Sequence, residues 1–284
     1  MYSYSLTEWI LFFYSYCFLG WMWESCYVSI KQKRWVNRGF MYGPCLPIYG
    51  WGAITVLLAT IPVRDHIALV FICGMIGATL LEYLTGAFME VLFHVRYWDY
   101  SKEPCNINGH ICLKASLAWG LFSVLMIYIL HAFIEMMVIF LHHAIAEIIA
   151  ALLMVIMMVD LIKSFKEAMD LKEMLMHLSM SHIEVQTIRK RLDVIMAIMD
   201  RDAAQLKEKL LQSKQDLSEK LIEEKMLYGK KLIEAYRHSI NILHRNPDAI
   251  SKRHAPVMQE LKEMEKAALG KLHKVKNKLD KKEK

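Results

Sequence analysis

The sequence predicts an all-α fold: a polytopic transmembrane helical bundle of about five spans, followed by a long helical or coiled-coil cytoplasmic region. Two observations predict this fold class. The 284 residues are 55% hydrophobic with a mean hydropathy of +0.24, which is a high average for a chain that ends in a polar half. Residues 1–162 carry eight Lys/Arg and ten Asp/Glu, whereas residues 163–284 carry twenty-seven Lys/Arg and nineteen Asp/Glu.

The polar half divides further at a proline. No proline lies between Pro104 and Pro247, so a helix can continue for a long way beyond the apolar part. We therefore predict three regions. They are a transmembrane bundle at residues 1–162, a cytoplasmic coiled-coil helix or helices at residues 163–246, and a C-terminal basic helix and tail at residues 247–284.

Five stretches are candidates for membrane spans, because a hydrocarbon core of about 30 Å needs about 20 predominantly apolar residues in a helix. The second stretch is short and has Gly50 and Gly52 near its start. We interpret it as a tilted or partly unwound helix buried among the others, since irregular backbone at membrane depth has to be shielded from lipid. The predicted spans are residues 8–30, 46–61, 67–93, 113–133 and 136–162.

Basic residues in the loops predict the orientation, because cytoplasmic loops of membrane proteins carry an excess of Lys and Arg. The first and third loops and the tail from Lys163 are basic, whereas the other side shows the N-terminus, the turn at residues 62–66 and a turn around Glu135. We expect the N-terminus outside and the C-terminus in the cytoplasm. No cleavable signal is recognisable at the start, so the first helix should remain as an anchor. The loop residues behind this orientation are Lys31, Lys33, Arg34, Arg38, Arg96, Lys102 and Lys114.

Apolar residues recur in heptad steps from Leu171 to Leu217, which indicates a partner helix. Two arrangements remain open: a homodimer or docked partner helix through residues 171–217, and a hairpin that closes on itself. Ser181 with Glu184 forms a capping-box pattern at which the helix could break. Acidic residues are interleaved with the basic ones and no aromatic pattern accompanies them, so we expect no nucleic-acid partner.

Two carboxylates inside the predicted spans are the strongest candidates for a site. Glu24 lies in the first span and Glu82 in the third, and an ionisable group at membrane depth costs at least a few kcal/mol unless it faces a partner or water. The segment of residues 35–50 is too rich in Gly and Pro for a helix and too aromatic for a solvated loop. We expect it to fold as a lid into the inner mouth of the bundle, where Arg38 can pair with Glu24 or Glu82.

The third loop adds acceptors, amides and aromatic groups at the same level of the bundle. Two interpretations of the resulting cluster remain open: a ligand or ion site, and an ion-pair network that fixes helix packing and loop position. The predicted ligand-binding or ion-pair cluster comprises Glu24, Asn37, Arg38, Tyr42, Tyr49, Glu82, Trp98, Asp99, Asn106 and Asn108.

Other chemistries find no support in the motifs. The sequence has no GxxxxGK[ST] phosphate-binding loop and no HExxH or GxSxG, so we assign no catalytic residue and no cofactor. Cys105 and Cys112 flank His110, but a second pair of metal ligands is missing, and we assign no metal site. Glu90 and Asp160 lie near the ends of spans and receive no role.

The sequence resembles a known bacterial family at its loops and at both carboxylates. The matching segments are Trp23 with Glu24, residues 37–50, Glu82 with Tyr83, residues 98–100 and residues 106–109. They are similar to the ABC-transporter type IV, or CmpB-like, permease family over roughly residues 10–160. Cys112 and Lys114 depart from the family pattern, where apolar residues are usual. The resemblance implies a multi-pass protein of the bacterial plasma membrane.

Three functions remain open for such a chain. The first is a transport permease or transporter subunit; because five spans are few for a complete route, it would require a dimer or a separate ATPase subunit. The second is an intramembrane enzyme that acts on lipid at the inner leaflet, with Glu24 or Glu82 as general base. The third is a membrane anchor for a coiled-coil interaction platform. In each case the lipid bilayer is a partner.

Overall fold

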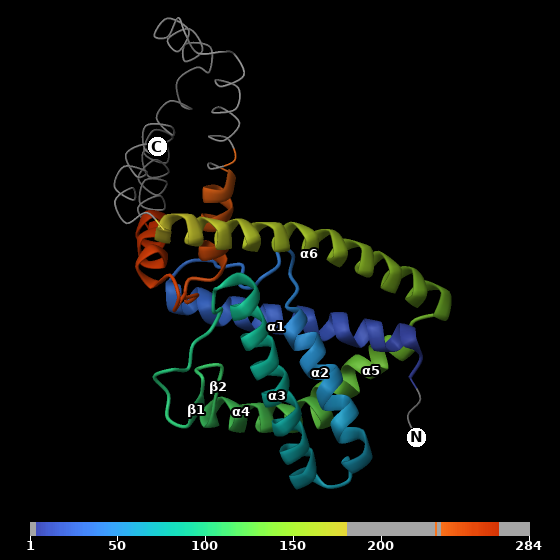
Figure 1. The fold of residues 1–284 in the computed structure, drawn as a ribbon. Coiled ribbons are helices and arrows are strands. Elements are labelled where there is room, and N and C mark those ends of the chain that lie inside the picture. The colour runs from blue at the N-terminus through green and yellow to red at the C-terminus, as the bar shows by residue number, and fades with distance from the viewer. Residues whose placement is uncertain (1–3, 181–230, 232–233, 267–284) are drawn as a thin grey trace, which may run out of the picture. The chain divides into compact units, whose positions relative to one another are not determined.

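Helices make up most of the structure, a computed structural model that describes residues 4–180, 231 and 234–266 (Figure 1). The chain divides into two compact units. The first unit comprises Met1–Lys166 and Leu243–Arg253, and the second comprises Glu167–Ile242 and His254–Lys284. Leu243–Arg253, which we call the strap, therefore belongs to the first unit although it lies far away in the sequence.

Helix α1 (Leu6–Gln32) begins at a capping box. The Ser5 hydroxyl accepts a hydrogen bond from the backbone N–H of Glu8, whose carboxylate accepts one from the backbone N–H of Ser5. The helix ends at Lys33, which adopts a left-handed backbone with φ 53°. The chain then enters the loop of residues 33–46.

Helix α2 (Pro47–Thr60) begins at a proline, which needs no hydrogen-bond partner at the first helical position. The alternative of a partly unwound segment is wrong, because all 14 residues are α-helical. Gly50 serves close packing instead: a Cβ atom there would collide with the side chains of Cys17 and Phe13 on α1. The turn η1 (Ile61–Val63) leads to α3 (Ile67–Phe93). The residue that follows α3, His94, adopts a left-handed backbone with φ 58°.

A small hairpin precedes the next helical run. Strands β1 (Asn106–Ile107) and β2 (Ile111–Cys112) pair antiparallel, with Asn106 opposite Cys112. Helix α4 (Leu113–Leu125), the π-helical turn η2 (Met126–Leu130) and helix α5 (His131–Ile139) then follow without interruption.

The turn predicted around Glu135 is wrong, because the chain turns at residues 140–142. Glu135 lies inside α5, where its carboxylate accepts a 2.7 Å hydrogen bond from the Tyr4 hydroxyl. A hydroxyl donor within the protein satisfies this acid, so it does not have to reach a solvated turn. The predicted fourth span is correspondingly longer than expected, and the fifth begins later.

Helix α6 (His143–Met180) is the longest described element. Further helices cover residues 234–245 and 255–266. Residues 171–180 of the predicted heptad segment are helical within α6, while its remainder, the predicted break at Ser181 and the end of the lysine-rich tail lie outside the described residues.

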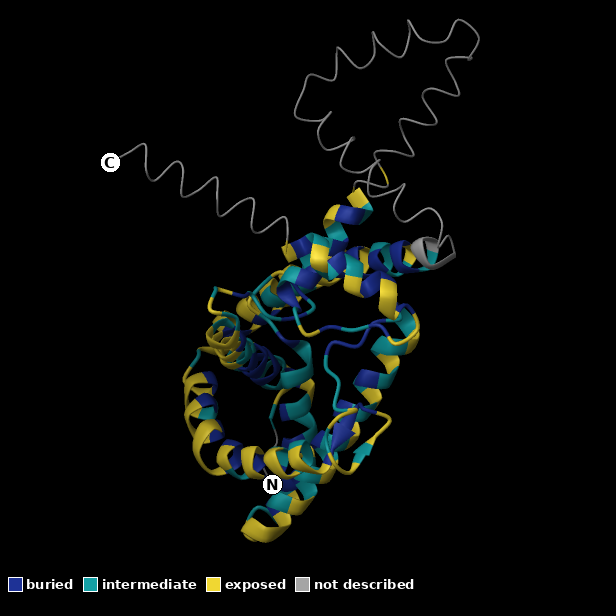
Figure 2. Ribbon diagram, turned by 90° about the vertical axis from the view of Figure 1, so that its left-hand side faces the viewer, coloured by how far each residue is buried: buried dark blue, intermediate teal, exposed yellow. Residues whose placement is uncertain are grey.

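Three described helical runs are long and apolar enough to cross a membrane: Ile67–Phe93, Leu113–Ile139 and His143–Met176. The structure thus supports a helical membrane protein, and the number of five spans stays a prediction. Helix α1 has 27 residues but is less apolar because of its tryptophans, tyrosines and serines, and the apolar helix Pro47–Val63 is shorter. In the first unit α3 packs against α2 and α4, and many helices bury one side and expose the other (Figure 2).

Candidate functional site

The first unit has two polar clusters at one end of its helices. The loops of residues 33–46 and 94–112 lie at this end. The first, which we call the inner cluster, lies among the helices. The second, which we call the loop cluster, joins the end of α3 to the loop that follows it. The inner cluster comprises Glu24, Arg38, Tyr49, Glu82, Tyr100 and Trp119, and the loop cluster comprises Tyr83, Glu90, Arg96, Asp99, Asn108 and His110.

Glu24 on α1 has two partners in the inner cluster. The Tyr49 hydroxyl donates a hydrogen bond to its Oε1 at 2.8 Å, and Nε of Arg38 lies 3.7 Å from its Oε2. The Tyr49 ring can reach this position because Gly20 leaves room on α1, where a Cβ atom would collide with the ring. The carboxylate keeps 30% of its side-chain surface exposed, so the ion pair is only partly buried. This ion pair is one of the two alternatives that the sequence left open for Arg38.

Arg38 is held on three sides. One terminal nitrogen donates to the Asn246 side-chain oxygen at 2.9 Å, and the other donates to the backbone oxygen of Tyr97 at 3.0 Å. Its backbone N–H donates to the Ser25 hydroxyl at 3.1 Å. The guanidinium therefore connects α1, both loops and the strap, and its orientation is set before any ligand binds.

Glu82 on α3 is 6% exposed and has neutral donors. The Tyr100 hydroxyl donates to its Oε1 at 3.1 Å, and the Trp119 indole donates to its Oε2 at 2.8 Å. Of the two predicted acids, Glu24 is thus the one with the cation. Both carboxylates nevertheless affect Tyr100. Burial raises the pKa of Tyr100 above its ordinary value, and the charge of Glu82 and, less strongly, that of Glu24 raise it further.

The loop of residues 33–46 is tied to the helices by an acid to which the sequence assigned no role. Asp160 on α6 accepts hydrogen bonds from the backbone N–H groups of Tyr42 at 3.0 Å and Gly43 at 2.7 Å. Asn37 accepts from the Trp21 indole at 2.6 Å and donates to the Tyr42 oxygen at 2.6 Å. Asn37 and Tyr42 therefore shape the loop rather than contact the two carboxylates.

The strap contacts both loops. Asn246 is 1% exposed, accepts from Arg38 as described above, and donates to the Gly39 oxygen at 2.9 Å. Farther along, Ile250 and Arg96 exchange two backbone hydrogen bonds of 2.7 and 2.9 Å in an isolated antiparallel bridge. The strap thus completes the hydrogen bonding of the site from a distant part of the sequence.

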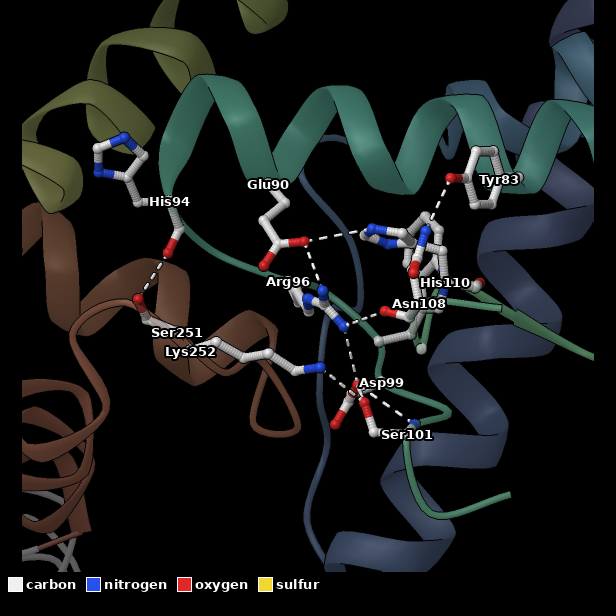
Figure 3. Close-up of polar contacts among 12 residues, drawn as sticks. Tyr83, Glu90, His94, Arg96, Asp99, Ser101, Asn108, His110, Ser251 and Lys252 are labelled. Carbon is white, nitrogen blue, oxygen red and sulfur yellow. Dashed lines mark hydrogen bonds and ion pairs between the residues drawn. The ribbon is translucent and has the colours of Figure 1, made fainter. Parts of the chain in front are cut away.

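The loop cluster is built around one arginine, as Figure 3 shows. Arg96 has a 7% exposed side chain, lies 2.7 Å from Glu90 and 3.2 Å from Asp99, and donates to the Asn108 oxygen at 2.7 Å. His110 approaches the same Glu90 oxygen at 3.2 Å. These contacts hold the loop against the end of α3.

The charges of the loop cluster stabilise one another. Burial works against the charge of Arg96, but Glu90 and Asp99 raise its pKa above the ordinary value. Burial likewise disfavours the Asp99 carboxylate, but hydrogen bonds from Ser101 and nearby cations hold its pKa below 3.8. Burial and the neighbouring Arg96 lower the pKa of His110, so its imidazole is neutral at pH 7 and donates to Glu90 through Nε2.

A family model covers this part of the chain. The model of the family described as Putative ABC-transporter type IV matches residues 11–165. The chain belongs to this family. The predicted resemblance is therefore confirmed, and the match includes both clusters but not the strap. None of the curated proteins and none of the solved structures matches the chain.

The ten predicted site residues of this ABC-transporter type IV family member divide between three places. Glu24, Arg38, Tyr49 and Glu82 lie in the inner cluster, and Asn37 and Tyr42 shape the loop beside it. The other four lie in or beside the loop cluster: Trp98 donates to the His110 oxygen, Asp99 pairs with Arg96, Asn106 braces the loop through Gly109, and Asn108 donates to the Tyr83 hydroxyl. The structure does not bring the ten together as one pocket.

Sequence reasoning missed several groups. Trp119 reads as one more aromatic residue in an apolar span, and Asp160 lies near a span end with no visible partner. Asn246 precedes a proline, which signals only a turn. Glu90 and His110 carried a usable signal, since an acid and a histidine near the ends of one loop can meet when the loop closes.

Proposed function

We propose that this chain is a transport permease or transporter subunit with a polar site at the cytoplasmic mouth of its helices. The observation that carries the proposal is the Arg38–Glu24 pair with the buried Glu82 beside it. One cation and two acids gathered among apolar helices are costly, and such groups usually mark substrate or ion pathways. The family description favours transport over catalysis.

We propose five membrane spans for this chain, with α1 and α2 added to the three long apolar runs. The N-terminus would lie outside, and the cytoplasmic region would begin at residue 163. Reporter fusions at residue 65 and after residue 102 test this topology. We expect the first fusion to be active only as an outside reporter and the second only as a cytoplasmic one, and the reverse result would contradict the orientation.

We further propose that partners complete the route. A separate ATPase subunit would supply energy, and the heptads of residues 171–217 would pair two copies or dock a partner helix. The strap is a suitable link between the cytoplasmic region and the membrane part, because Asn246 binds Arg38 directly.

Copurification tests the transport function. Full-length tagged chain is extracted from membranes in mild detergent, and we expect a nucleotide-hydrolysing subunit to copurify with it. Glu24→Gln should lower the nucleotide hydrolysis of that complex while the complex still forms. Lys114→Gln, which replaces a charge outside the inner cluster, is the matched control and should leave hydrolysis unchanged.

Two other outcomes would overturn this proposal. If the chain purifies without an ATPase and turns over an added phospholipid in a Glu24-dependent manner, the intramembrane enzyme is correct. If Glu24→Gln leaves every activity unchanged while loss of the cytoplasmic region abolishes function, the chain is a membrane anchor for that region.

A further inference from the structure

A separate cavity lies at the end of α3, away from the inner cluster. Its volume is about 410 Å³, and it is lined by Glu90, Val91, His94 and Arg253. All four residues belong to the first unit. The cavity lies at the C-terminal end of α3, one of the three apolar runs long enough to cross a membrane. With α3 as a span, that end falls at the level of the lipid headgroups.

The cavity presents an acid, Glu90, and a cation, Arg253. Arg96 and His110 both contact the same carboxylate oxygen of Glu90, Oε2. The other oxygen points away from His110 (Figure 3). Arg253 is exposed, and one of its terminal nitrogens lies 3.4 Å from Nε2 of His94. A guanidinium has five N–H donors, so most of the donors of Arg253 do not take part in this contact.

An apolar stripe leads along α3 to this cavity. Leu80, Leu84, Phe88 and Val91 are 58%, 56%, 63% and 77% exposed. Their spacing of four, four and three residues places them on one face of the helix. Val91 belongs both to the stripe and to the cavity lining. An acyl chain that follows the stripe would bring its headgroup to Glu90 and Arg253.

We propose that this cavity binds a phospholipid whose headgroup carries both a phosphate and a primary ammonium, as phosphatidylethanolamine does. The phosphate accepts hydrogen bonds from Arg253, and the ammonium donates to the second oxygen of Glu90. A lipid with a purely anionic headgroup fits less well, because Glu90 would repel it. A trimethylated ammonium fits less well because it has no N–H to donate.

This site does not depend on the proposed transport function. Its residues are separate from the Glu24–Arg38 pair, so Glu24→Gln should leave lipid retention unchanged. The transport proposal could therefore fail while the lipid site stands, and the reverse also holds.

Native mass spectrometry of the full-length chain tests the proposal. The chain is equilibrated with equal amounts of phosphatidylethanolamine, phosphatidylcholine and phosphatidylglycerol that share the same acyl chains. We expect about tenfold preferential retention of phosphatidylethanolamine, the size expected for one charge-assisted hydrogen bond. Equal retention of all three lipids, or preference for either of the others, would overturn the proposal. This comparison needs no substitution, so misfolding cannot obscure it.

Variants locate the site. Arg253→Ala should lower retention of phosphatidylethanolamine about tenfold, and Arg253→Lys should keep most of it. The control is Arg237→Ala, an exposed arginine that does not line the cavity. An equal loss in Arg253→Ala and Arg237→Ala would refute the location. Soluble glycerophosphoethanolamine should displace the lipid only weakly, and complete displacement at equal concentration would show that the apolar stripe plays no part.

Discussion

The inner cluster and the loop cluster hold similar side chains but connect different parts of the chain. The inner cluster draws on α1, α2, α3, α4, both loops and, through Asn246, the strap. The side chains of the loop cluster all come from residues 83–110. Damage to the inner cluster should therefore loosen several elements at once, whereas damage to the loop cluster should stay with one loop.

The two clusters contain the same charged groups, one arginine and two acids, but arrange them differently. In the loop cluster one cation, Arg96, has two acids within 3.2 Å. In the inner cluster there are two acids, and the cation lies beside Glu24, while Glu82 has hydroxyl and indole donors. The second acid of the inner cluster is thus held by neutral donors, which suits a site that accepts a cationic or hydrogen-bond-donating ligand.

The largest expected effect is that of Arg38→Ala. It leaves Glu24 with Tyr49 as its donor and removes the donors to Asn246 and to the Tyr97 oxygen. We expect a loss of about 2–3 kcal/mol in the free energy of unfolding, less than for a fully buried pair because Glu24 is 30% exposed. Unfolding of the purified chain by denaturing detergent measures it.

Arg34→Ala is the matched control, because Arg34 lies in the same loop and contacts His244 of the strap. It should cost clearly less than Arg38→Ala. If the two substitutions lower the free energy of unfolding equally, the contacts of Arg38 stabilise the fold no more than other contacts of the same loop do.

The second prediction concerns the room left for Tyr49. Gly20→Ala places a methyl group in the Tyr49 ring and should displace its hydroxyl from Glu24. Overpacking of about 1–3 kcal/mol outweighs the gain of about 1 kcal/mol in helix propensity. At Gly52 the nearest side-chain atom would lie 3.9 Å from a new Cβ, so Gly52→Ala should be neutral or slightly stabilising. Thermal unfolding of both variants distinguishes a packing effect from a general effect of glycine replacement.

The same contrast explains what the sequence could predict. The helical membrane class, the first three helices and an ion pair between Arg38 and one of two acids follow from apolar length, glycine and proline punctuation and the cost of buried charge. A pair was predictable because Arg38 is the one Lys or Arg in residues 35–50, the segment expected to fold into the mouth of the bundle. The choice between Glu24 and Glu82 was not, since it depends on Tyr100 and Trp119, which occupy the oxygens of Glu82.

Long-range partners were beyond the sequence for a physical reason. Asn246 binds Arg38 across 208 positions, and Asp160 binds the backbone of Tyr42 across 118. A neutral amide, or an acid that caps backbone N–H groups, has no complementary charge to reveal its partner. The turn near Glu135 was misplaced for a similar reason, because the hydroxyl of Tyr4 satisfies that acid inside a helix.

The third prediction compares the two acids of the inner cluster. Glu24→Gln removes the countercharge of Arg38 and should cost about 1–2 kcal/mol. Glu82→Gln removes a buried charge whose hydrogen-bond donors are neutral. The weaker hydrogen bonds and the relieved burial of a charge offset one another, so the free energy of unfolding should change by no more than about 1 kcal/mol. Denaturant unfolding measures both. A larger loss for Glu82→Gln would mean that its carboxylate charge is stabilised by the site.

The smallest expected effect belongs to the loop cluster and depends on pH. Burial lowers the pKa of His110 below its ordinary 6.5, so the folded chain binds fewer protons there than the unfolded chain does. The contribution of His110 to stability is therefore fully present above its ordinary pKa of 6.5 and is lost as the pH falls through the lowered pKa of the folded chain. Asp99 stays ionised over this range, because its pKa is below 3.8.

His110→Gln isolates this contribution. The difference in unfolding free energy between the unaltered chain and the variant should be largest at pH 7.5 and should shrink toward pH 5. His66→Gln, at an exposed histidine before the start of α3, should leave the pH dependence of the unaltered chain in place. Hydrogen exchange should show the loosening confined to residues 94–112. If exchange instead rises throughout α1 and α2, the loop cluster supports the whole bundle, and the distinction between the two clusters fails.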